Sequence, residues 1–125
     1  MRLPKTINLV TQPTLTSCTA ACLSMVTGYN IHDVLKEVSD PCGYHSEIRY
    51  LTSLGLGCEV SFQIFSTELS IVTCASKNLY DLHSVVLDNR NNKFLLYDPN
   101  QGREDKKIIE LEDLKWAYLL NIYEF

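Results

Sequence analysis

Apolar residues recur at helical spacing in the first half of the chain and at strand-like spacing in the second. The first half also carries residues that commonly begin and end helices, such as a capping hydroxyl or amide and a terminating glycine. Three helices are predicted: one that follows Thr16 or Ser17 and ends at Gly28, one over residues 31–38 that Asn30 caps, and one that Ser46 and Glu47 open and Gly55 closes.

The second half reads as a series of strands. Residues 59–65 alternate between polar and apolar, as a strand with one wet face does. Residues 69–75 are a continuous apolar run, ambiguous between strand and helix, whose β-branched residues favour strand. Residues 83–87 and 93–97 flank a polar loop and predict a hairpin. Residues 6–11 predict a short strand or an extended entry. The other predicted strands are 59–65, 69–75, 83–87, 93–97, 107–111 and 118–125, with a helical turn at 112–116. Helices followed by a mostly antiparallel sheet predict an α+β fold.

Composition and charge narrow the class of protein. The 125 residues suffice for one core but not for two ordinary domains, so we expect one domain over residues 1–125. A net charge of −4 without a basic run gives no reason to expect a nucleic-acid partner. No apolar stretch approaches the roughly 18 residues of a membrane span. The five cysteines suggest no disulfide framework, so we expect a reducing, cytoplasmic location.

The segment from Gln12 to Gly28 carries the most informative chemistry. Cys18 falls in the first turn of the first predicted helix, where unpaired backbone N–H groups and the helix dipole favour a thiolate. Gln12, just upstream, could donate its side-chain amide to a developing oxyanion, together with the backbone N–H of Cys18. This arrangement is typical of a cysteine nucleophile.

A base and a carboxylate are found at the predicted hairpin. His83 opens one apolar run, and Asp98 closes the other. Antiparallel pairing of residues 83–88 with 93–98 brings Asp98 back beside His83, where a carboxylate would fix the tautomer and orientation of the imidazole. We therefore expect Cys18, His83 and Asp98 as nucleophile, base and orienting residue, with Gln12 as oxyanion donor.

Several short motifs together resemble a known family. They comprise Gln12, Cys18, Ala21, Cys22, Leu23, Met25, His83, Val85, Val86, Leu87, Tyr97, Asp98, Pro99 and Gly102. The combination resembles the papain-like cysteine peptidases and, more narrowly, the bacteriocin-processing domains that cut leader peptides after a double glycine. The resemblance covers most of the chain and implies a papain-like fold, a Cys18–His83–Asp98 triad, Gln12 as oxyanion donor and a peptide or protein substrate. We expect neither a cofactor nor a catalytic metal.

The sequence departs from that family in two respects. Thr19 follows the nucleophile, where glycine is common in the family, which could alter the floor of the cleft. The sequence also carries no transmembrane or ATPase part, so the leader-peptidase role of transporter-linked members does not simply carry over. A stand-alone domain could cut another substrate.

Other functions use the same residues. An acyl or amide transferase or a deamidase would share the acyl-thioester intermediate, and a peptide-binding module could keep the fold without turnover. Structural zinc on Cys18-x3-Cys22 and Cys42-x2-His45 is a weaker alternative, because no Cys-x2-Cys knuckles are present. Cys22, Cys58 and Cys74 are interpreted as packing residues, and His32 and His45 as solvated helix residues.

Overall fold

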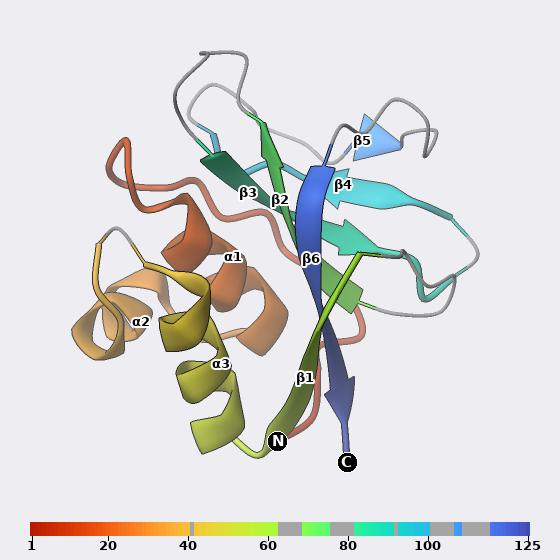
Figure 1. Ribbon diagram of the computed structural model, residues 1–125, viewed down its shortest axis with the longest axis horizontal. Helices are drawn as coiled ribbons and strands as arrows, with labels where there is room; N and C mark the ends of the chain where they lie inside the picture. Colours follow the sequence, from red (N-terminus) through yellow and green to blue (C-terminus); the bar gives the residue numbers. More distant parts are fainter. Residues whose placement is uncertain (41, 63–68, 76–81, 92, 101–106, 109–115) are drawn as a thin grey trace.

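In the described parts of the chain, three helices precede six strands, and the helices lie together on one side of the sheet (Figure 1). The computed structural model describes residues 1–40, 42–62, 69–75, 82–91, 93–100, 107–108 and 116–125. The elements are α1 (Cys18–Thr27), α2 (Ile31–Glu37), α3 (Tyr44–Ser53), β1 (Leu56–Ser61), β2 (Leu69–Ala75), β3 (Leu82–Asp88), β4 (Leu95–Tyr97), β5 (Lys107–Ile108) and β6 (Trp116–Glu124). This arrangement confirms the α+β class with N-terminal helices.

The helix boundaries follow local chemistry. Gly28 ends α1 in the left-handed conformation at φ 79°, which L side chains rarely adopt, and its N–H donates to the carbonyl of Ser24. The Asn30 side chain caps α2 by accepting a hydrogen bond from the N–H of His32 at 2.8 Å. The third helix begins at Tyr44, two residues before the predicted start, because Gly43 takes the N-cap position without a side-chain cap.

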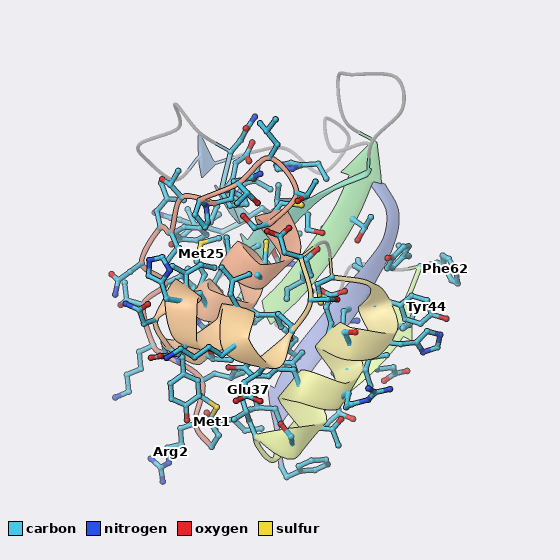
Figure 2. All side chains as sticks on the ribbon, turned by 90° about the vertical axis from the view of Figure 1, so that its left-hand side faces the viewer. Met1, Arg2, Met25, Glu37, Tyr44 and Phe62 are labelled. Carbon is cyan, nitrogen blue, oxygen red and sulfur yellow. The ribbon has the colours of Figure 1, made fainter. Side chains whose placement is uncertain are left out.

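The sheet is antiparallel at every pairing between the described strands, in the order β1-β6-β2-β3-β4-β5. The C-terminal strand β6 therefore lies between β1 and β2. The helices cover one face of the sheet, as the perpendicular view in Figure 2 also shows. None of the helices in the described parts of the chain is long and apolar enough to cross a membrane.

Alternate residues of the central strands pack into two clusters. Ile71, Val86 and Leu120 belong to the larger core with the helices. Their neighbours Val72, Val85, Leu87 and Leu119 form a second cluster. Successive strand residues point to opposite faces, so the central strands are buried on both sides. Burial on both faces explains why residues 69–75 form a continuous apolar run, and the prediction that they form a strand is confirmed.

For residues 6–11 the sequence predicted a short strand or an extended entry, and the strand is not formed. The segment is described, but it forms no strand and runs beside α1. Ile7 is buried in the larger core, and Leu9 and Val10 pack against that core. The apolar, β-prone residues of this segment are thus explained by side-chain burial rather than by pairing with a strand.

Two other boundaries differ from the predictions. β1 begins at Leu56, three residues before the predicted start. Its second residue, Gly57, lies against the ring of Tyr123, where a Cβ would clash. The predicted hairpin is confirmed by the β3–β4 pairing. The last strand starts at Trp116 rather than residue 118. Some predicted elements lie partly outside the described residues: the end of the strand over 59–65, most of the strand over 107–111 and most of the helical turn at 112–116.

Candidate active site

Cys18 is the first residue of α1, and its side chain is half-buried. The loop before it is closed by Ser17, whose hydroxyl accepts a hydrogen bond from the N–H of Thr14 at 3.0 Å. The hydroxyl of Thr14 donates in turn to Asp40, at 2.8 Å. These contacts fix the point at which the chain enters the helix. The thiol is thereby held at the positive end of the helix dipole.

His83 and Asp98 meet across the hairpin. Nε2 of His83 lies 2.7 Å from Oδ1 of Asp98, and the two side chains are 20% and 17% exposed. The β3–β4 register pairs Val86 with Tyr97, so one step further Asp98 lies opposite Val85. Asp98 and His83 are thus diagonal neighbours on one face of the hairpin. The same carboxylate oxygen also accepts the N–H of Asn100 at 2.9 Å, which orients it.

The imidazole of His83 also contacts the thiol. Its side chain forms a hydrogen bond with Cys18. Because Nε2 faces Asp98, the ring nitrogen left for the sulfur is Nδ1. His83 is therefore held between a carboxylate and a thiol, each in contact with a different nitrogen.

The two pKa values move in opposite directions. Burial alone would raise the pKa of the Cys18 thiol. The hydrogen bond and the charge of His83 lower this pKa, as do hydrogen bonds from the backbone of Ser84 and the side chain of Thr19. Together they outweigh burial, and the pKa lies below 9.0. The hydrogen bond to Asp98, followed by that to Cys18, raises the pKa of His83 to about 9 against the opposing effect of burial. A lowered thiol pKa beside a raised imidazole pKa favours a thiolate–imidazolium pair.

Gln12 is buried close to the same loop, with 4% of its surface exposed. Its Nε2 donates to the carbonyls of Thr14 and Leu15, at 2.8 and 3.2 Å. Its backbone N–H donates to the carbonyl of Pro99 at 2.8 Å. In this arrangement the side-chain amide clamps the loop before Cys18. The oxyanion role of Gln12 stays a prediction.

The contacts of three residues near the nucleophile were not predicted from the sequence. Thr19 and Ser84 join α1 to β3 through their hydroxyls, which lie 3.0 Å apart. Glu47 in the first turn of α3 is only 3% exposed, and burial followed by the charge of Cys18 raises its pKa to about 8. Its sequence spacing from Leu51 and Leu54 is helical, and this spacing is the signal that could have placed it on the buried face.

The remaining cysteines differ from Cys18. Cys22 is fully buried in the core, which confirms its packing role. Cys58 is half-buried on β1, where burial raises the pKa of its thiol. Burial, and then the charges of Glu47 and Cys18, raise the pKa of Cys42 to about 12. The side chain of Cys74 lies outside the described part of the structure.

The zinc alternative finds no support in the geometry. Within the described ranges, no three or more His, Cys, Asp or Glu side chains come together as a metal site would require, and this includes Cys18, Cys22, Cys42 and His45. His45 and His32 are exposed on their helices, as predicted.

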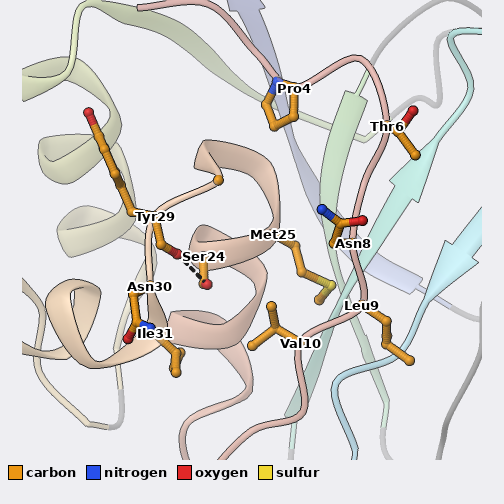
Figure 3. Close-up of a pocket in the computed structure, with 11 residues that line it drawn as sticks. Pro4, Thr6, Asn8, Leu9, Val10, Ser24, Met25, Tyr29, Asn30 and Ile31 are labelled. Carbon is orange, nitrogen blue, oxygen red and sulfur yellow. Dashed lines mark hydrogen bonds between the residues drawn. The ribbon is translucent and has the colours of Figure 1, made fainter.

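A cavity of about 490 Å³ opens elsewhere in the molecule, between the N-terminal segment and the ends of α1 and α2 (Figure 3). Its walls mix the apolar side chains of Val10 and Met25 with the polar ones of Asn8 and Ser24, and Ser24 donates to the carbonyl of Tyr29 at 2.6 Å. None of the four predicted site residues lines it. The chemistry around Cys18 is thus separate from this cavity.

Comparison with known proteins adds no assignment to this geometry. A scan against models of protein families finds none that matches the chain, and a search of curated proteins finds no significant match.

Proposed function

We propose that the chain is a small papain-like cysteine peptidase that hydrolyses a peptide bond through an acyl-enzyme on Cys18. The observation that carries this proposal is the contact of His83 with both Asp98, at 2.7 Å, and Cys18, whose thiol pKa is lowered. Cys18 begins α1, and His83 lies on strand β3 of the antiparallel sheet. This placement of the two residues supports the papain-like fold. The free thiols of Cys18, Cys42 and Cys58 support a reducing, cytoplasmic location.

The reaction follows from the protonation state of the pair. The Cys18 thiolate attacks the scissile carbonyl carbon, and the carbonyl oxygen becomes an oxyanion. Protonated His83 gives its proton to the leaving amine as the C–N bond breaks, which leaves a thioester on Sγ. Neutral His83 then takes a proton from water, whose oxygen attacks the thioester carbonyl. The thiolate leaves, and the imidazolium is restored.

The surrounding groups have defined parts in this reaction. Asp98 holds Nε2 of His83 and stabilises the imidazolium. The backbone N–H of Cys18 belongs to the first turn of α1, where it has no partner within the helix, and it is one donor for the oxyanion. Gln12 supplies the second donor once its bond to Leu15 opens.

The test is a comparison of wild-type protein with Cys18→Ala and a matched Cys42→Ala variant in a cell lysate. New peptide N-termini are mapped by mass spectrometry. The wild type and Cys42→Ala are expected to produce the same new termini, and Cys18→Ala none. Cleavage that survives in Cys18→Ala would overturn the proposal, and so would products that change in mass without fragmentation, because transfer or deamidation would then be the reaction.

A further inference from the structure

The residues directly after the nucleophile and the base are hydrogen-bonded to each other. Oγ1 of Thr19 lies 3.0 Å from Oγ of Ser84, although 65 positions separate them in sequence. Both side chains are buried, with 7% and 4% of their surfaces exposed. The bond joins the first turn of α1 to the strand β3 that carries His83.

These two residues also contact the sulfur. The hydroxyl of Thr19 and the backbone N–H of Ser84 each form a hydrogen bond with Cys18. A thiolate accepts hydrogen bonds and donates none, so the Thr19 hydroxyl must use its single proton for Sγ. Its oxygen is then free to accept the proton of the Ser84 hydroxyl. One directed chain, from Ser84 through Thr19 to Cys18, gives both buried hydroxyl protons an acceptor.

We propose that Thr19 and Ser84 are positioning residues for the proposed reaction: their hydroxyl pair sets the helix that carries Cys18 against the strand that carries His83, and Thr19 directs its O–H at the sulfur. This inference rests on the proposed function. A protonated thiol offers a far weaker acceptor than a thiolate, so the directed chain stabilises the reactive form. The backbone N–H of Ser84 contributes in the same way, and its place depends on the same helix–strand contact.

The pH dependence of Cys18 alkylation by iodoacetamide tests this inference, because only the thiolate reacts. The variant Thr19→Val keeps the shape of the side chain and removes the hydroxyl. Its alkylation midpoint is expected about one pH unit above that of the wild type, with roughly tenfold slower labelling well below the midpoint. Thr19→Ser, which restores the hydroxyl, is expected to return the midpoint to the wild-type value. Ser84→Ala is expected to shift it in the same direction but less, because Thr19 keeps its own proton.

Thr27→Val is the matched control. Thr27 is also buried on α1, and its hydroxyl donates to the carbonyl of Leu23 at 2.7 Å. This variant should lose stability without moving the midpoint. A Thr19→Val midpoint equal to that of the wild type would overturn the inference and leave the proposed function intact. A wild-type midpoint at or above 9 would instead overturn the proposed function. If Thr19→Val does not fold, an unshifted midpoint in Ser84→Ala overturns the inference.

Discussion

The backbone N–H of Gln12 donates to the carbonyl of Pro99 at 2.8 Å. This bond ties the loop that leads into Cys18 to the segment that directly follows Asp98. The nucleophile and the orienting carboxylate are therefore held together at two places, through the imidazole of His83 and through this backbone contact. The position of the loop before Cys18 is therefore coupled to the position of the segment that follows Asp98.

We expect Gln12→Ala to weaken both the fold and the reaction. The substitution removes two hydrogen bonds from a buried amide, to Thr14 and Leu15, so the free energy of unfolding should fall by about 1–3 kcal/mol. Loss of an oxyanion donor should also slow peptide cleavage by roughly 100-fold or more. Denaturant unfolding and cleavage assays measure the two effects. The exposed amide of Asn8 gives the control, since Asn8→Ala should change neither. Full cleavage activity in Gln12→Ala would show that its amide only clamps the loop.

Asp98→Asn should lower the pKa of His83 from about 9 towards the ordinary 6.5, because the hydrogen bond to the carboxylate is the largest cause of the increase. A raised imidazole pKa contributes stability that is complete below pH 6.5 and is lost as the pH rises through about 9. The variant should therefore be destabilised at pH 6, by about 1–2 kcal/mol, and little at pH 10. NMR titration of the His83 ring and unfolding at both pH values check this. Asp33→Asn, on the exposed side of α2, is the control. An unchanged His83 titration would contradict the expectation.

Glu47→Gln should remove a pH dependence of stability. The Glu47 carboxyl keeps its proton up to about pH 8 in the folded chain, against the ordinary 4.5. The folded state thus binds more protons between these values, and stability falls as the pH rises from about 4.5 to about 8. Between pH 5 and pH 8, the free energy of unfolding of the variant should rise relative to that of the wild type by on the order of 3 kcal/mol. Unfolding at both pH values measures this. Glu59→Gln, on the exposed part of β1, is the control and should show the pH dependence of the wild type. If the free energy of unfolding of Glu47→Gln changed with pH as that of the wild type does, Glu47 would not be a buried neutral acid.

Local patterns predicted the features that depend on neighbouring residues. The hairpin that brings His83 to Asp98 spans a short polar loop, and its pairing follows from the two apolar runs on either side. The position of Cys18 at a helix start and the cap at Asn30 likewise depend on a few adjacent residues. Such features are specified within a short window of sequence.

Features that depend on distant contacts were missed. For residues 6–11 the composition left a short strand and an extended entry open, because strand pairing depends on distant residues; in the fold Ile7, Leu9 and Val10 pack into the core without pairing. The burial of Glu47 depends on which face of α3 meets the rest of the molecule. The bond between Thr19 and Ser84 requires the docking of α1 on β3. These contacts arise only when the elements assemble.

The rate of Cys18 alkylation by iodoacetamide as a function of pH, in wild type and in His83→Ala, tests the thiolate–imidazolium pair most directly. In the wild type, Cys18 should react before Cys42 and with a midpoint below 9, since the thiol pKa of Cys18 is lowered and that of Cys42 is raised to about 12. In His83→Ala the midpoint should rise, because the hydrogen bond and the charge of His83 are lost while burial and the weaker contributions of Ser84 and Thr19 remain. A wild-type midpoint at or above 9, or one that His83→Ala leaves unchanged, would contradict the assignment of Cys18 as an activated nucleophile.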